Sequence, residues 1–334
     1  MDYRNLGVSG LKVSPICLGT MMFGGPTDEE EAAQIIDHAR NAGVNFIDIA
    51  DMYNAGKSEE IVGRALAKDR ESWVVATKVG NPMGEGPNQR GLSRAYVIRA
   101  CEASLARLAM DHVDIYYLHT EDHDTPLEET VSALEHLWRA GKIRYVGVSN
   151  FRAWRIAELT WLMREAGMGE PVVCQPYYNA MNRMPEVEIL PACAHYGIGV
   201  VPFSPLARGV LTGKYAPDTE PVEGTRAARR DERMMQTEWR RESLVASQKI
   251  KAHAEAVGIS AAQFAVAWVL NNALVDSVLA GPRTLEHWEH YLGALDYVFT
   301  EEDEALIDSL VAPGHPSTPG YTDPKYPVEG RLVF

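Results

Sequence analysis

The stretch VNFIDIADMYNAGKSEEIVGRAL, residues 44–66, contains the unit on which the fold prediction rests. Its first seven residues, 44–50, form an apolar run of the length expected for a buried strand. Apolar residues with helical spacing follow over residues 58–66. The stretch therefore predicts a strand, a polar loop and a helix, which together form one unit of a parallel sheet.

The same unit recurs along the chain. Seven further apolar runs precede helical patterns: residues 16–18, 73–78, 113–119, 143–150, 171–175, 198–204 and 276–281. Eight such units, with no run left for a second sheet, predict an α/β fold: an eight-stranded parallel (β/α)8 TIM barrel. A doubly wound open sheet is the competing fold, but its GxGxxG turn after the first strand is missing.

Capping signals and periodicity predict the helices. Thr27 and Glu30 have the spacing of a capping box, and the helix that they begin should stop at Gly43. The other helices are predicted over residues 58–66, 93–108, 127–140, 153–166, 186–196, 242–257, 261–270 and 285–294. A long irregular segment precedes the helix that begins near residue 242.

The two ends of the chain have patterns of their own. Two short runs around Gly7 and Gly10 predict an N-terminal hairpin over about residues 3–14. The tail, about residues 313–334, is rich in Pro and Gly, so we expect it to be irregular and to pack near the barrel mouth. We predict one barrel domain over residues 1–334, with long loops at its C-terminal face.

The composition restricts the class of partner. The chain has 334 residues and a net charge of −14, with no block of like charges, which argues against nucleic acid and anionic membranes. It has no apolar run of membrane-spanning length and no leader pattern, so we expect a cytoplasmic protein that binds a small molecule, with its oligomeric state open. Four scattered cysteines suit a reducing compartment: Cys17, Cys101, Cys174 and Cys193.

Polar residues end nearly every predicted strand, and the carboxyl ends of barrel strands meet around one mouth. The strand ends are Asp48, Lys78, His119, Ser149 with Asn150, Gln175, Phe203 with Ser204, and Gly281, and Tyr53 follows in a loop. A single polar residue at a strand end is usually one that leaves the core for solvent. A convergent set instead predicts an active site.

Four of these residues suit proton transfer. Tyrosine is a weak acid with a pKa of about 10, and an ammonium group nearby favours its phenolate. We therefore expect Lys78 to lower the pKa of Tyr53, Asp48 to keep the lysine charged, and His119 to orient the phenol or a substrate oxygen. The group would act as a proton donor and not as a nucleophile.

His119 also opens the segment HTEDHD, residues 119–124, which resembles a set of metal ligands. A metal site needs ligands that converge on one point, yet no second cluster of His or Cys stands at another strand end. We assign His123 to a polar loop and predict no metal.

Several segments resemble the aldo-keto reductases over nearly the whole chain. FIDIADMYNAGKSEEIVGRAL (46–66), VVATKV (74–79) and VDIYYLH (113–119) are similar to the family segments that carry its catalytic residues. The resemblance implies that Asp48, Tyr53, Lys78 and His119 form the family tetrad. It also implies a barrel closed at its bottom by a hairpin, and hydride transfer between a nicotinamide cofactor and a carbonyl, with tyrosine as general acid.

The resemblance further implies NADPH as cofactor. GVSNF (147–151), VVCQPYYN (172–179), PFSPLARGVLTGK (202–214) and LAGPRT (279–284) are similar to family segments around the cofactor. Arg283 would bind the 2′-phosphate and favour NADP over NAD. The implied cofactor-binding residues are Thr20, Met21, Asp48, Ser149, Asn150, Gln175, Phe203, Ser204, Leu206, Gly209, Lys214, Gly281, Arg283 and His287.

The chain departs from the family pattern at two places. His287, His290 and Tyr291 replace the usual Gln and Glu-Asn pair on the adenine side, and the turn after the tyrosine reads NAGKSE, residues 54–59. The implied substrate contacts are Phe23, Tyr53, His119 and Arg152. Arg152 and the tyrosines of the tail would suit an oxygen-rich, sugar-like carbonyl compound.

These observations predict an NADPH-dependent reductase of an aldehyde or ketone. One alternative is the same barrel working as an NADP-dependent alcohol or sugar dehydrogenase. Another is a cofactor-binding regulatory subunit, because some barrels of this family serve membrane channels. The complete tetrad favours catalysis.

Overall fold

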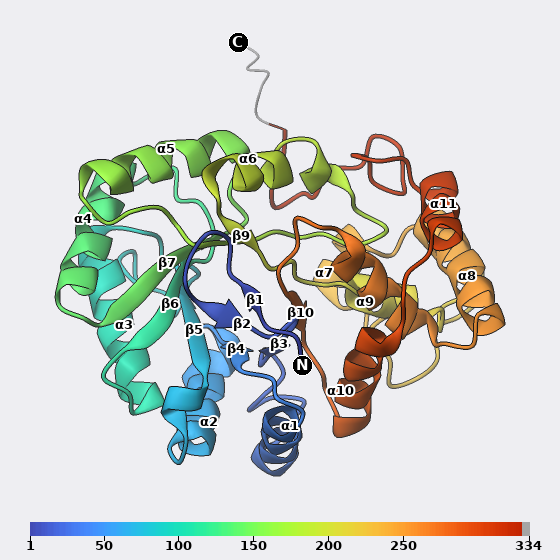
Figure 1. Cartoon of the computed structure of the whole chain (residues 1–334), viewed down its shortest axis with the longest axis horizontal. Coiled ribbons are helices and arrows are strands. Elements are labelled where there is room, and N and C mark those ends of the chain that lie inside the picture. Colours follow the sequence, from blue (N-terminus) through green and yellow to red (C-terminus); the bar gives the residue numbers. More distant parts are fainter. Residues whose placement is uncertain (329–334) are drawn as a thin grey trace.

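The computed structural model describes residues 1–328, and a sheet of eight parallel strands forms its centre (Figure 1). The strands are β3 (Ile16–Gly19), β4 (Phe46–Asp48), β5 (Val74–Val79), β6 (Val113–Leu118), β7 (Ile143–Ser149), β8 (Val173–Gln175), β9 (Gly199–Val200) and β10 (Val278–Ala280). They pair in the order β10-β3-β4-β5-β6-β7-β8-β9. The two edges are linked by Asp276 N donating to Val200 O and Leu279 N to Pro202 O, both at 3.0 Å. The predicted (β/α)8 barrel is confirmed.

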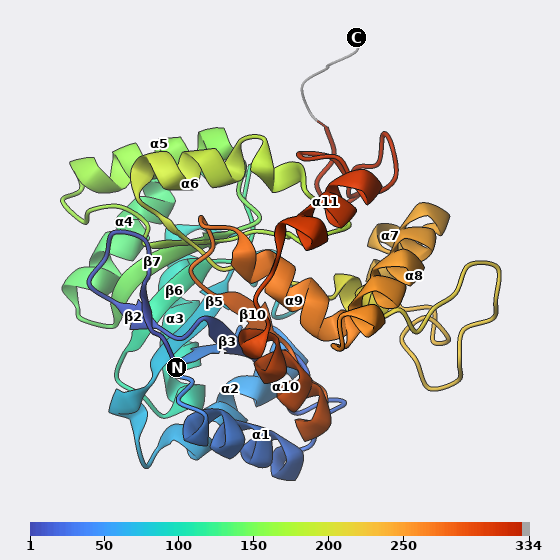
Figure 2. The same cartoon turned by 45° about the vertical axis from the view of Figure 1, so that its right-hand side comes forward.

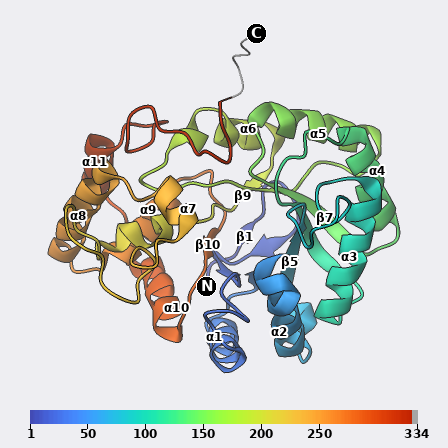
Figure 3. The ribbon, with the colours of Figure 1, turned by 180° about the vertical axis from the view of Figure 1, so that it is seen from behind.

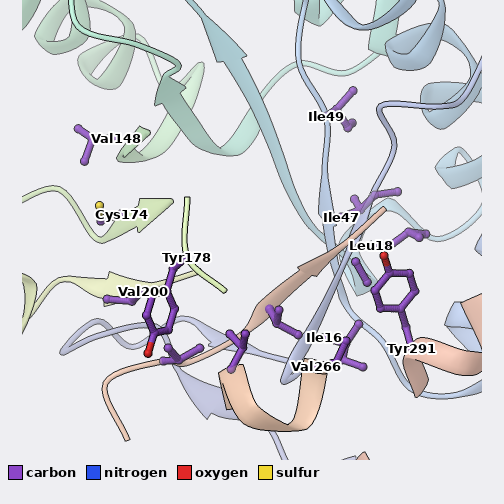
Figure 4. Packing of buried hydrophobic residues seen from close by; sticks show 14 of the residues in the cluster. Ile16, Leu18, Ile47, Ile49, Val148, Cys174, Tyr178, Val200, Val266 and Tyr291 are labelled. Carbon is purple, nitrogen blue, oxygen red and sulfur yellow. The ribbon is translucent and has the colours of Figure 1, made fainter. Parts of the chain in front are cut away.

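Alternate side chains along each strand point to opposite faces of the sheet. One set fills the barrel interior: Cys17, Phe46, Val74, Ala76, Ile115, Tyr117, Val173 and Val201. The intervening residues, such as Ile16, Leu18 and Ile47, join the larger core between the sheet and the helices (Figure 4). Each strand is therefore buried on both faces, which explains its continuous apolar sequence.

The hairpin of β1 (Arg4–Asn5) and β2 (Lys12–Val13) closes the amino-terminal end of the barrel, as predicted. Leu6 and Val13 are fully buried and belong to the interior cluster. Gly7 N donates to the Asp276 carboxylate at 3.0 Å, which attaches the hairpin to the segment before β10.

Helices surround the sheet and follow the predicted pattern. They are α1 (Glu29–Asn41), α2 (Lys57–Leu66), α3 (Arg94–Leu108), α4 (Leu127–Arg139), α5 (Ala153–Glu165), α6 (Ile189–Tyr196), α7 (Glu232–Thr237), α8 (Arg241–Ala256), α9 (Ala261–Asn271), α10 (Leu285–Leu292) and α11 (Glu301–Leu310). The predicted Thr27–Glu30 capping box is wrong. Asp28 caps α1 by accepting from Glu31 N at 2.9 Å, and the Thr27 hydroxyl donates to Arg283 O at 2.7 Å.

Two helices were not predicted. The short helix α7 lies inside the segment expected to be irregular, and the Asp231 side chain caps it. The helix α11 follows the eighth unit and begins with a capping box of Thr300 and Asp303. The single helix predicted over residues 186–196 is divided into a 3-10 turn, Met184–Glu186, and α6.

Two long segments extend from the helical layer. The segment between β9 and α7, yellow in Figure 2, stands out beyond α8. Residues 313–328 run from α11 towards α6, seen from opposite sides in Figures 1 and 3. Over residues 1–328, no single helix is long and apolar enough to cross a membrane. The pair α8 and α9, bent by 96°, meets that test together by length and composition alone.

Candidate active site

Side chains alternate between the two faces of a strand, and this alternation makes three of the predicted catalytic side chains point towards one place. Asp48, Lys78 and His119 each lie two positions after a strand residue of the interior cluster, so their side chains face the same way. Tyr53 follows β4 in a turn. The four residues therefore meet at the carboxyl ends of β4, β5 and β6.

The Lys78 ammonium connects the other members of this group. It forms an ion pair with the Asp48 carboxylate, and both side chains are fully buried. It also donates to Ile49 O at 2.8 Å and contacts the Tyr53 hydroxyl at 3.3 Å. The second Asp48 oxygen accepts from Gln175 Nε2 at 2.8 Å. The atoms that contact the Lys78 ammonium thus come from the end of β4 and from the segment that follows it.

Burial and neighbouring charges act against each other at both Tyr53 and Lys78. It raises the pKa of Tyr53, and the Lys78 charge opposes this rise without overcoming it. Burial by itself would lower the pKa of Lys78, but attraction to Asp48 and Tyr53 outweighs burial and raises that pKa. The expected net lowering of the Tyr53 pKa is therefore corrected. Tyr53 is therefore a protonated phenol at neutral pH.

His119 lies beside the tyrosine as a neutral imidazole. The two rings meet edge to face, with their centroids 6.0 Å apart and their planes at 81°. Burial, and then the charges of Lys78 and Lys325, lower the pKa of His119 well below its usual value. The ring is therefore suited to a hydrogen bond with a substrate oxygen and not to carrying a positive charge.

A cavity of about 1420 Å³ opens at this end of the barrel. Asp48, Tyr53 and His119 line it, whereas the buried Lys78 lies behind them. The cavity is also lined by every residue predicted to bind the cofactor: Thr20, Met21, Asp48, Ser149, Asn150, Gln175, Phe203, Ser204, Leu206, Gly209, Lys214, Gly281, Arg283 and His287. The structure thus brings the predicted cofactor residues and most of the tetrad to one cavity.

Backbone strain is concentrated beside the tetrad. Asn150 follows β7 and Ser204 follows β9, and each has φ of 58°, in the left-handed region. Such conformations occur where a side chain must be held for function. Asn150 Nδ2 donates to His119 O at 2.9 Å and to Ser149 Oγ at 3.0 Å. The amide group thereby attaches the carboxyl ends of β6 and β7 to one another.

The far end of the cavity is rich in cations. They are Lys214, Arg226, Arg229 and Arg283, accompanied by the carboxylates Glu223, Asp231 and Glu286. Burial, with Lys214 and Arg283 nearby, lowers the pKa of His287. His290 and Tyr291, the departures from the family pattern, line this end as well. Guanidinium and ammonium donors suit phosphate oxygens, so the residues present fit the phosphates of a dinucleotide.

Two predicted substrate contacts are corrected. Phe23 is fully buried in the core and is not among the residues that line the cavity, where Met21 and Met22 stand instead. Arg152 also lies outside the lining, and its Nη2 donates to the backbone oxygens of Tyr326 and Pro327 at 3.0 and 2.8 Å. Arg152 therefore holds the C-terminal segment.

Sequence reasoning missed several lining residues. Asp323, Lys325 and Tyr326 come from the tail, and no sequence motif indicates their position. The Arg-rich stretch RAARRDER, residues 226–233, indicates an anion site from sequence alone. In the altered turn, Asn54 Nδ2 donates to Met21 O and Phe23 O at 3.0 and 2.7 Å, which joins the tyrosine turn to the first loop.

Two acidic side chains of the HTEDHD segment, Asp122 and Glu121, accept hydrogen bonds from other groups of the protein. Asp122 accepts from Leu92 N and Thr125 Oγ1, both at 2.7 Å, and Glu121 accepts from Arg152 N at 2.7 Å. Within residues 1–328, no three His, Cys, Asp or Glu side chains are grouped so that they could hold a metal ion.

The fold and this group of side chains define a class, the (β/α)8-barrel oxidoreductases. The Aldo/keto reductase family model matches residues 15–312, and the chain belongs to that family. It is 38% identical to a probable voltage-gated potassium channel subunit beta of Oryza sativa subsp. japonica, over 93% of this chain and 97% of the relative. It is 36% identical to an uncharacterized oxidoreductase of Bacillus subtilis (93% and 96%), and 33% identical to a versiconal hemiacetal acetate reductase of Aspergillus parasiticus (94% and 98%).

Proposed function

We propose that this chain reduces an aldehyde or ketone to the alcohol with NADPH, and that Tyr53 is the general acid. The observation that carries the proposal is the 3.3 Å contact between the Lys78 ammonium and the Tyr53 hydroxyl, with Tyr53 and His119 in the wall of one cavity. Membership of an oxidoreductase family supports it. The substrate would be a small carbonyl compound.

Each residue of the site would have its own role in the reaction. Bound NADPH would supply hydride from its nicotinamide ring. Tyr53 would donate its proton to the carbonyl oxygen, and the neutral His119 would hydrogen-bond the same oxygen and orient it. Lys78 would stabilise the phenolate left on Tyr53, and Asp48 would keep Lys78 charged.

The proton-donor role is tested by Tyr53→Phe. We expect hydride transfer to an unactivated aldehyde to slow by ~10²–10⁴-fold, because the proton source is lost while the ring still fills its space. The affinity for NADPH should stay nearly unchanged. Single-turnover loss of NADPH absorbance measures the rate. Transfer at close to the parent rate would show that Tyr53 is not the acid.

We propose a preference for NADPH because Arg283 and Lys214 lie at the cation-rich end of the cavity. NADPH should raise the melting temperature more than NADH does, because at equal concentration the ligand that binds more tightly stabilises the folded state more. Arg283→Ala should remove most of this difference and leave the NADH shift nearly unchanged. Arg144→Ala, at an exposed position near the start of β7, is the control. Equal shifts for both cofactors in the parent chain would refute the role of Arg283.

A second candidate is a cofactor-binding subunit of a membrane channel. Two plant relatives, at 38% and 37% identity, carry the name of probable voltage-gated potassium channel subunit beta. A screen of aldehydes, ketones and sugars with NADPH, and of alcohols with NADP⁺, separates the candidates and sets the direction of reaction. Tight NADPH binding without turnover on any of them would favour the second candidate.

A further inference from the structure

Three arginines hold the C-terminal segment at the rim of the cavity. Arg233 of α7 donates to both carboxylate oxygens of Asp323, at 3.0 and 2.5 Å. Arg152, just before α5, donates to the two backbone oxygens of residues 326 and 327. The Arg240 guanidinium lies 3.7 Å from the centre of the Tyr321 ring. Contacts from three separate elements therefore determine where this segment lies.

This attachment places Lys325 at the catalytic end of the cavity. Lys325 lines the same cavity as Tyr53 and His119. Its Nζ is 3.5 Å from Oδ1 of Asn81, in the loop after β5. Its charge also contributes to the lowered pKa of His119, after burial and Lys78. The ammonium group therefore faces the cavity that Tyr53 and His119 also line, beside the loop that follows β5.

Lys325 lacks a counter-ion within residues 1–328. The carboxylate closest in sequence, Asp323, is paired with Arg233. A third cation of the cavity wall, Arg208, lies 4.0 Å from the Glu238 carboxylate. Burial, and then the charges of Arg233 and Arg208, lower the pKa of Lys325, although Asp323 acts against this. This part of the cavity thus has a surplus of positive charge, which an anionic ligand would balance.

We propose, building on the proposed reductase function, that the substrate carries an anionic group, a carboxylate or a phosphate, in addition to its carbonyl. Lys325 binds this group while the carbonyl oxygen lies at Tyr53 and His119. A hydrogen bond between charged groups at a partly exposed site contributes about 10-fold to kcat/KM. A neutral analogue of the same shape would lose that contribution.

The experiment compares three aldehydes of similar shape with NADPH: 4-formylbenzoate, 4-formylphenyl phosphate and methyl 4-formylbenzoate. In the parent chain, kcat/KM for at least one anion should exceed that for the ester by about 10-fold. Lys325→Met should bring this ratio to about one, Lys325→Arg should keep part of it, and Lys325→Glu should reverse it. Lys12→Met, on the hairpin at the opposite end of the barrel, should keep the parent ratio. The two anions show whether carboxylate or phosphate is preferred.

The inference and the proposed function fail in different ways. Equal kcat/KM for ester and anions in the parent chain, or an unchanged ratio in Lys325→Met, overturns the anionic substrate and leaves the reductase intact. If none of the three aldehydes is reduced, calorimetry with terephthalate and its dimethyl ester on the NADPH complex decides the inference without turnover. Binding of terephthalate that weakens in Lys325→Met supports it, and equal binding of the two compounds overturns it.

Discussion

Asp51 is a buried carboxyl group two residues before Tyr53, with only 1% of its surface exposed. Burial, with Glu59 nearby, raises its pKa to about 7, whereas an unfolded aspartate titrates near pH 3.9. Between these values the unfolded chain releases a proton that the folded chain keeps. The free energy of unfolding should therefore fall as pH rises from about 4 to 7, by about 4 kcal/mol at most.

Asp51→Asn should remove this pH dependence. Relative to the parent chain, its free energy of unfolding should increase as pH rises from 4.5 to 8, because the amide carries no charge at either pH. Urea denaturation at both pH values measures the change, with Asp2→Asn, at an exposed position, as the control. Parallel behaviour of Asp51→Asn and the parent chain would contradict the raised pKa.

The position of a single residue can be predicted well from sequence when the alternation of side chains along a strand determines where its side chain points. Asp48, Lys78 and His119 each follow an interior strand residue by two positions, so their convergence could be predicted. Phe23 and Arg152 lie in loops, where no such period applies. Their neighbours, the core and the C-terminal segment, are determined by contacts far along the chain.

Among the elements, α2 packs against α3 through Gly63, where a Cβ atom would lie 2.3 Å from the Leu108 carbonyl oxygen. Alanine favours a helix over glycine by about 1 kcal/mol, but a clash with backbone cannot be relieved by a change of rotamer and costs about 3 kcal/mol. Gly63→Ala should thus lower the free energy of unfolding by about 2 kcal/mol, measured by urea denaturation.

Gly10→Ala is the matched control, because no atom lies within 4 Å of the Cβ that it would introduce. Its stability should stay within about 0.5 kcal/mol of the parent. A Gly63→Ala chain as stable as the parent would mean that the two helices can separate without loss.

Helix ends were predictable where the cap is local. Ser93 and Ser260 cap α3 and α9 by accepting from backbone amides three residues later, and sequence alone indicates both. Thr27 and Asp28 are adjacent residues that can both cap a helix, and the structure uses Asp28, the stronger N-cap. Thr27 instead reaches the carbonyl of Arg283, a partner 256 residues away that no local pattern indicates.

For the molecule as a whole, the count of eight strand and helix units and the missing GxGxxG turn together favoured the barrel over an open sheet. The position of the C-terminal segment depends on long-range contacts. The sequence predicted only that this segment would pack near the barrel mouth. The hairpin covers one end of the barrel, and this segment lines the cavity at the other. Substrate recognition should therefore depend on residues that lie far from the tetrad in sequence.

The attachment of the C-terminal segment yields a final prediction. Arg152→Ala removes both hydrogen bonds from the guanidinium to the backbone oxygens of residues 326 and 327. Because these bonds are partly exposed, we expect a loss of about 1.5 kcal/mol, which would raise KM for an aldehyde by about 10-fold. The affinity for NADPH should change less than twofold, since Arg152 lies outside the cavity lining.

Limited proteolysis gives a readout that does not depend on turnover. Cleavage after Lys325 by trypsin should be faster in Arg152→Ala than in the parent chain, because the segment opens more often when its anchor is lost. Arg164→Ala is the control, since this residue lies on α5, the helix that follows Arg152, but pairs with Glu170. An unchanged cleavage rate together with an unchanged KM would show that Arg233 and Arg240 hold the segment without Arg152.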